Sequence, residues 1–244
     1  MCVRLLKKAI DQKAINKDIY HGYAPPQYGP IPSRPATTYL DPALKNPPYP
    51  FNLTKAKALL TAHGWREVHG VMTKGGKSLS FPLMYSSGNT STSDMATLLQ
   101  SDLAKIGIKV TLVPKTSSTE LGIVTNTAQE NQWDAVAGFS IRFTGLYPAG
   151  DAVFYSGGGL DFFGWHNAKE DALINAFQGP APNPKASLQA YYKFEEYTAH
   201  NLPVLFMNRP GTIEAVATNV HGVNPMTLNP VTGYGLPQRW WVAK

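Results

Sequence analysis

The fold class of this chain is decided by residues 79–113, LSFPLMYSSGNTSTSDMATLLQSDLAKIGIKVTLV. The first seven of these residues alternate in polarity, which predicts a β-strand. A helix follows that Ser91 or Ser93 caps and Gly107 ends, with apolar residues three and four positions apart. A second strand is expected at 108–113. A strand, a helix and a strand of this length form a βαβ unit with parallel strands, so the sequence predicts an α/β fold.

The stretch just upstream, GVMTKGGKSLSF at 70–81, resembles a phosphate-binding loop because it contains Gly76-Lys77-Ser78. Such a loop requires four residues between its first glycine and the GK[ST] tail, and a helix directly behind it. Here five residues separate Gly70 from Gly76, and the predicted strand comes next. We therefore interpret this stretch as a Gly-Gly turn between two extended segments, which excludes it as a nucleotide site.

The rest of the chain continues the alternation of helices and strands. Asp11 caps the second of two short helices, and Gly64 ends a later one. Asn167 and Glu170 form a capping-box-like helix start. The expected elements are two short helices within 3–20, a proline-rich extended loop at 25–35, helices at 53–63, near 117–129, from 168 and at 185–200, a buried strand at 133–139, a long aromatic loop at 140–166, and closing strands at 202–207 and 212–217.

Composition limits the possible functions. The chain has 244 residues, of which 43% are apolar and 11% aromatic, enough for a packed core. We expect a soluble protein, since no apolar run approaches the roughly 18 residues that span a bilayer. No signal peptide is recognised, so the chain is either cytosolic or a piece whose export signal lies elsewhere. The net charge of +6 suggests an anionic partner, but the basic residues are scattered, which disfavours nucleic acid.

Catalytic and metal-binding patterns are absent from the sequence. One cysteine excludes an internal disulfide, and the six histidines lack metal-ligand spacing, so we expect surface or capping histidines, no metal and no cofactor. No GxSxG nucleophile elbow occurs. Glu195 and Glu196 are neighbours on a helix, point to different faces and are expected in solvent. Asp151 and Asp161 either pair with a cation or ligand amine or simply form turns.

Candidate binding residues cluster where loops leave the carboxyl ends of strands, the edge at which open α/β sheets bind ligands. The loop SSGNTSTS at 86–93 can offer backbone amides to an anion, although helix capping explains it more simply. Arg142, Phe143, Tyr147 and Trp165 combine aromatic faces with one cation, which suits a moderately polar small molecule. This favours binding over turnover.

The order of segments resembles the family 5 extracellular solute-binding proteins, the peptide, dipeptide and nickel receptors of ABC importers. The similar segments cover nearly the whole chain. They are VRLLKKAIDQKAINKDIYHGYAPPQYGPIPS, FNLTKAKALLTAHGW, LLQSDLAKIGIKVTL, WDAVAGFS, FGWHNAKEDALINAF and LPVLFMNRPGTIEAVATNVHGV.

This resemblance implies a class II periplasmic-binding-protein-like lobe, with a mixed, mostly parallel sheet flanked by helices. Residues 1–244 would be the C-terminal ligand-binding lobe of a two-lobe protein whose first lobe is absent, with about 219–244 returning toward that lobe. The implied function is non-enzymatic capture of a solute between the lobes and delivery to ABC permease subunits. The implied location is periplasmic or extracellular, peripheral to the membrane, with lipid anchoring left open.

The resemblance also implies that the loop after WDAVAGFS lines the ligand cleft. Peptide-binding members have an aspartate there that pairs with the peptide amino terminus, but the matching position is Gly145 or Leu146, and Asp151 is the nearest substitute. Peptides, nickel chelates, oligosaccharides and antibiotics therefore stay open as ligands. The rival hypothesis is a cytosolic α/β enzyme with the aromatic loop as a lid. The expected cleft wall is Tyr85, Ser87, Arg142, Phe143, Tyr147 and Trp165.

Overall fold

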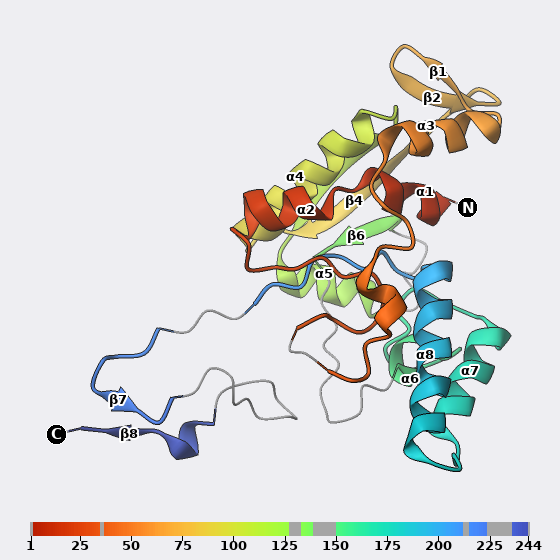
Figure 1. The fold of residues 1–244 in the computed structure, drawn as a ribbon. Coiled ribbons are helices and arrows are strands. Elements are labelled where there is room, and N and C mark those ends of the chain that lie inside the picture. Colours follow the sequence, from red (N-terminus) through yellow and green to blue (C-terminus); the bar gives the residue numbers. More distant parts are fainter. Residues whose placement is uncertain are drawn as a thin grey trace.

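The structure, a computed structural model, describes residues 2–34, 37–126, 133–138, 150–211, 215–223 and 236–243. These residues form a parallel sheet with helices around it, a small antiparallel sheet at one end, a helical layer beside it, and a thin two-stranded ribbon near the C-terminus (Figure 1). The predicted α/β class is confirmed.

The parallel sheet has the strand order β5-β4-β6. Strand β4 (Ser80–Ser86) lies in the middle and pairs in parallel with β5 (Lys109–Lys115) and β6 (Ala135–Ala137). Helix α4 (Thr90–Ala104) connects β4 to β5, so the predicted βαβ unit is confirmed. The predicted serine cap is wrong, because the side chain of Asn89 accepts the hydrogen bond from Thr92 N at 3.1 Å.

One hydrophobic core lies between this sheet and the first helices. Met95, Leu99 and Leu103 form the buried face of α4, and Ile106 and Ile108 follow them into the core. Gly107 between them has φ +80°, and a Cβ there would come within 3.0 Å of Met72. The same core includes residues from α1 (Cys2–Ala9), the π-helix η1 (Ile15–Ile19) and α3 (Leu53–Ala62), while the short helix α2 (Gln12–Ala14) lies between α1 and η1 in the chain. Asp11 caps α2 as predicted, through bonds from Lys13 N and Ala14 N.

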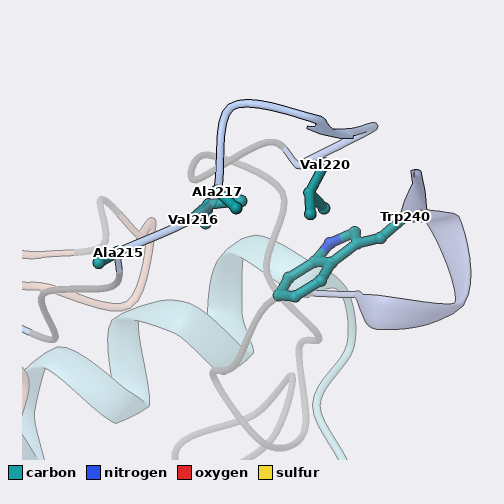
Figure 2. A pocket seen from close by; sticks show the side chains of 5 residues that line it. All are labelled: Ala215, Val216, Ala217, Val220 and Trp240. Carbon is teal, nitrogen blue, oxygen red and sulfur yellow. The ribbon is translucent and has the colours of Figure 1, made fainter. Parts of the chain in front are cut away.

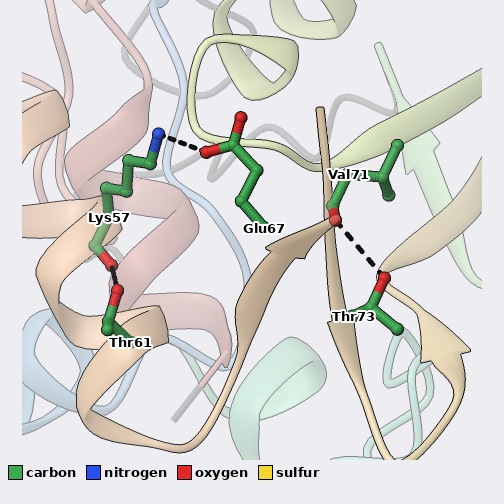
Figure 3. A network of polar contacts seen from close by, with 5 residues as sticks. All are labelled: Lys57, Thr61, Glu67, Val71 and Thr73. Atoms are coloured by element: carbon green, nitrogen blue, oxygen red, sulfur yellow. Dashed lines mark hydrogen bonds and ion pairs between the residues drawn. The ribbon is translucent and has the colours of Figure 1, made fainter. Parts of the chain in front are cut away.

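The small antiparallel sheet contains the stretch that resembles a phosphate loop. Its strands are β1 (Arg66–Val68), β2 (Val71–Lys74) and β3 (Lys77–Ser78). Gly75 and Gly76 have φ of +56° and +75°, which confirms the Gly-Gly turn. Lys57 on α3 forms an ion pair with Glu67 on β1 at 2.5 Å, which ties this sheet to the helix that precedes it (Figure 3).

A second core, built largely of aromatic rings, lies in the helical layer. Its helices are α6 (Asp151–Phe154), α7 (Ala168–Gln178) and α8 (Pro184–Asn201). Phe177, Tyr191 and Phe194 are fully buried, with ring centroids 4.9 to 5.6 Å apart. The 3-10 helix η2 (Pro42–Lys45) packs against α8. Helix α5 (Ser117–Val124) packs against β4 of the sheet and is shorter than predicted.

The closing strand predicted at 202–207 is wrong, since the structure has no strand there. Instead, buried polar side chains hold this segment: Lys7 Nζ and Gln12 Nε2 both donate to the carbonyl of Phe206. Asn208 Nδ2 donates to the carbonyls of Gln12 and Ala24, each at 2.8 Å. The second predicted strand, 212–217, lies partly outside the described residues, and 215–217 form no strand.

Beyond this segment the described chain forms a ribbon that extends away from both cores (Figure 1). Strand β7 (Val220–His221) pairs antiparallel with β8 (Trp241–Val242), and the short helix η4 (Pro237–Arg239) precedes β8. Of the described helices, none is both long and apolar enough to cross a bilayer.

Candidate functional site

The carboxyl edge of the parallel sheet carries two of the residues expected in the cleft wall. Tyr85 is half-buried near the end of β4, in register with Pro114 on β5 and Ala137 on β6. Ser87 is exposed just beyond the strand, and both its backbone N–H and its hydroxyl donate to the Lys115 carbonyl, at 2.9 and 3.1 Å. The structure therefore brings Tyr85 and Ser87 together at an accessible edge.

Hydroxyl groups that the sequence interpretation missed surround this pair. Ser86 Oγ lies 2.5 Å from Ser117 Oγ, which joins the end of β4 to the start of α5. Thr116 caps α5 by accepting from Thr119 N, just as Asn89 caps α4. The run Thr-Ser-Ser-Thr at 116–119, directly after the strand, was a readable signal. Two helix N-termini with exposed hydroxyls suit a ligand rich in hydrogen-bonding groups.

The chain after β6 also leaves the sheet at this edge. Gly138 has φ +88°, and a Cβ there would come within 2.5 Å of Thr92 Cγ2 in the first turn of α4. Only glycine permits this close approach. Arg142, Phe143 and Tyr147 follow but lie outside the described residues, so their expected place in the cleft wall stays a prediction.

Trp165, the remaining residue of the expected wall, is fixed to the helical layer. Its indole Nε1–H donates to Glu170 Oε2 on α7 at 2.8 Å, and its backbone N–H donates to Asp161 Oδ1 at 2.8 Å. The ring is partly exposed. Asp161 therefore stabilises a turn, which was one of its two proposed roles, while Asp151 opens α6.

Two glutamates in this layer are buried, which the sequence interpretation did not expect. Asn167 caps α7 as predicted, but Glu170 does not complete a capping box. Its carboxyl is fully buried and contacts Trp165 Nε1 and Thr198 Oγ1, and burial raises its pKa despite these bonds. Glu195 was expected in solvent but is also fully buried, and burial raises its pKa to about 8, whereas Glu196 is exposed.

Metal binding and the histidines were the other candidates for chemistry. Within the ranges described above, no three His, Cys, Asp or Glu side chains gather to hold a metal ion. The histidines behave as surface or capping residues: His63 Nδ1 lies 2.7 Å from the Leu59 carbonyl, and His200 Nδ1 lies 2.8 Å from the Glu196 carbonyl.

The C-terminal ribbon presents an apolar surface. A hollow of about 370 Å³ lies here, and the indole of Trp240 is part of its wall (Figure 2). Next to it, Trp241 is 58% exposed and stacks on His221 at 4.4 Å, and Val242 is 62% exposed. The hollow is lined by Ala215, Val216, Ala217, Val220 and Trp240.

The fold is that of the bacterial solute-binding proteins. Residues 6–161 match the family described as bacterial extracellular solute-binding proteins, family 5 middle, so the chain belongs to this family. The oligopeptide-binding protein AppA of Bacillus subtilis (strain 168) is 27% identical over 247 aligned residues, which cover 98% of this chain and 43% of AppA.

Solved structures agree with this assignment. AppA from Bacillus subtilis, in complex with a nonapeptide, superposes with a TM-score of 0.82 at 25% identity, over 99% of this chain and 47% of that one. NikZ from Campylobacter jejuni, in complex with Ni(L-His), shares the fold with a TM-score of 0.70 at 21% identity, over 97% and 47%. This chain thus spans less than half the length of these relatives.

Proposed function

We propose that this chain is the C-terminal ligand-binding lobe of an extracellular solute receptor that delivers an oligopeptide or peptide-like solute to an ABC permease. The observation that carries the proposal is the alignment of nearly the whole chain with 43% of an oligopeptide-binding protein. A region of that size is one lobe of a two-lobe receptor, so the second wall of the cleft belongs to residues outside this chain. In this proposal the solute is captured between the two lobes.

The cleft wall on this side comprises Tyr85, Ser87 and Trp165, together with Arg142, Phe143 and Tyr147. Tyr85 supplies an aromatic face, and the hydroxyls beside Ser87 supply hydrogen bonds to a peptide backbone. The close passage of Gly138 past Thr92 starts the following loop at the same edge, which supports placing Arg142 there.

We assign the ribbon to the contact with the missing lobe, as the return segment at about 219–244. Beside its apolar hollow, the ring of Trp241 stacks on His221 with one face, yet among the described residues Trp241 and Val242 are still 58% and 62% exposed. Exposed apolar groups gathered on an extended arm are typical of a surface that another body covers. The first lobe of the same receptor is the occupant, because the ribbon extends away from both cores of this lobe (Figure 1).

A thermal-shift experiment on the full-length protein that carries this chain tests the function. We expect oligopeptides to raise its melting temperature by several degrees, since ligand at a hundred times its dissociation constant adds about 2.7 kcal/mol. Metal chelates and oligosaccharides serve as the other cargo classes. A shift with Mg-ATP and with none of these solutes would contradict the receptor and support the enzyme hypothesis.

The role of Asp151 gives a second test. It lies half-buried in the first turn of α6, directly after the segment expected to line the cleft. If it binds a peptide amino terminus, Asp151→Asn in the full-length protein weakens free-amine peptides about ten-fold or more, because a charge-assisted bond is lost. N-acetylated peptides should bind both proteins equally. Equal affinities of the two proteins for free-amine peptides, measured by calorimetry, would remove Asp151 from the site.

A further inference from the structure

Positive charge is concentrated at one end of the molecule, which we call the basic end. It consists of α3, the antiparallel sheet and the turn between α4 and β5, residues 53–79 and 101–109. The basic end contains seven cationic side chains and two carboxylates, and this net charge of +5 compares with +6 for the whole chain. The seven are Lys55, Lys57, Arg66, Lys74, Lys77, Lys105 and Lys109.

Most of this charge is available to an external partner. Both carboxylates are already paired, Glu67 with Lys57 at 2.5 Å and Asp102 with Lys105 at 2.7 Å. Among the described residues, no carboxylate pairs with Lys55, Arg66, Lys74, Lys77 or Lys109, and all five side chains are exposed. A surface of unpaired like charges is costly unless an anion or salt screens it.

The basic end is one connected unit. The Lys57–Glu67 ion pair joins α3 to the sheet, as Figure 3 shows. Met72 N donates to the Gly107 carbonyl at 2.8 Å, and Lys109 N donates to the Leu79 carbonyl at 3.0 Å, so the sheet is fixed to the start of β5. Figure 1 shows the antiparallel sheet at the far end of the molecule from the C-terminal ribbon. A flat partner can therefore reach the basic end without touching the ribbon.

The kind of side chain indicates the kind of partner. Six of the seven cations are lysines, which are flexible point charges, whereas protein interfaces are depleted of lysine and enriched in aromatic residues and arginine. The aromatic Trp65 is partly buried, and the largest exposed apolar side chain here is Val68 at the tip of the β1–β2 turn. Clustered lysines around a small apolar tip suit a surface that carries many phosphate groups, such as a lipid membrane.

We propose that the basic end docks on the anionic phospholipid headgroups of a membrane. Each lysine near such a surface adds a similar electrostatic attraction, and salt screens it. This contact does not involve the carboxyl edge of the parallel sheet, so it leaves that edge open. The proposal is independent of which solute the lobe binds.

Vesicle sedimentation tests this proposal. We expect the protein to bind vesicles of mixed phosphatidylglycerol and phosphatidylcholine at low salt, and not vesicles of phosphatidylcholine alone. The double variant Lys55→Gln/Lys77→Gln should bind about twenty-five-fold more weakly, at about five-fold for each charge removed. The control Lys185→Gln/Lys193→Gln removes the same charge from exposed positions on α8 and should bind as the parent does.

Three results would overturn the proposal. An equal loss in both double variants would mean that total charge acts, not the basic end. Absence of binding to phosphatidylglycerol vesicles at low salt would exclude a lipid surface. Binding to soluble polyglutamate without binding to vesicles would assign the basic end to an acidic protein. Equal melting temperatures of the variants and the parent serve as the folding control.

Discussion

Replacing Glu195 by glutamine should raise the free energy of unfolding at pH 8 by up to roughly 4 kcal/mol, and by less than about 1 kcal/mol at pH 4.5. Burial raises the pKa of Glu195 from 4.5 to about 8 in the folded protein. Between these two pH values the folded state binds more protons than the unfolded state, so stability falls as pH rises. Glutamine does not titrate, so the variant lacks the decrease in the free energy of unfolding that the ionisation of Glu195 causes.

The surroundings of Glu195 explain why its charged form is unfavourable. Its Oε2 accepts from Asp41 N at 2.7 Å, but its Oε1 has no hydrogen-bond partner among the described residues. The negative charge of Asp41 adds repulsion. The amide oxygen of glutamine can keep the bond from Asp41 N, which holds η2 against α8. The substitution therefore removes the buried charge and preserves this contact.

The measurement is urea unfolding of both proteins from pH 4.5 to 8, read as a difference. Lys7 contributes in the opposite direction, because burial lowers its pKa from 10.5 to about 7 and stability from this group rises above pH 7. Subtracting the parent cancels that contribution. Glu196→Gln removes a carboxylate from the exposed neighbouring position and is the matched control for the change of charge on α8. A difference for Glu195→Gln that does not grow with pH would contradict the prediction.

Local periodicity predicted the parts of the fold that depend on near neighbours. The βαβ unit at 79–113, the Asp11 cap and the turn at Gly75-Gly76 all rest on contacts within a few residues, or on a single helix between two strands. The segment 202–207 was misassigned because it is apolar but takes its hydrogen bonds from Lys7 and Gln12, almost two hundred residues away. No pattern within a short window contains that information.

Burial of the glutamates was partly readable. Tyr191 lies four residues before Glu195, Phe194 lies one before it, and Thr198 lies three after it. These three buried residues place Glu195 on the buried face of α8. The identity of the side chain, not its position, led to the expectation of solvent. At the candidate site, the strand at 79–85 was predicted from its alternation, and it places Tyr85 and Ser87 at the carboxyl edge, whereas the contact of Ser86 with Ser117 required the folded structure.

The second large effect is expected at Glu170. Glu170→Ala should lower the free energy of unfolding by about 3 kcal/mol, because it leaves a cavity and removes the partners of two polar groups. Trp165 Nε1–H loses its acceptor at 2.8 Å, and Thr198 Oγ1 loses one of its two contacts, because the one with the Phe194 carbonyl remains. A Trp165 ring without this anchor is free to rotate, so solute affinity should fall together with stability if the ring lines the cleft.

Glu170→Gln is the informative companion variant. Thr198 carries one hydroxyl proton but contacts two oxygen acceptors, the Phe194 carbonyl at 2.9 Å and the Glu170 carboxyl. A protonated carboxyl resolves this, because it donates to Thr198 while Thr198 donates to Phe194, and the raised pKa of Glu170 favours that form. Glutamine reproduces the same arrangement with its amide, since N–H can donate to Thr198 and C=O can accept from Trp165.

The free energy of unfolding of Glu170→Gln should therefore lie within about 1 kcal/mol of the parent's, and Trp165 should stay in place. Urea unfolding measures the free energy. The wavelength of the tryptophan fluorescence maximum reports whether the Trp165 indole stays in place or becomes more exposed, and the Trp165→Phe variant shows how much of the signal comes from this residue. If glutamine destabilises as much as alanine, the carboxyl is ionised and accepts both bonds as an anion. If Glu170→Ala lowers the free energy of unfolding by less than about 1 kcal/mol, Glu170 does not anchor Trp165. The structural argument for placing Trp165 in the cleft wall would then fail.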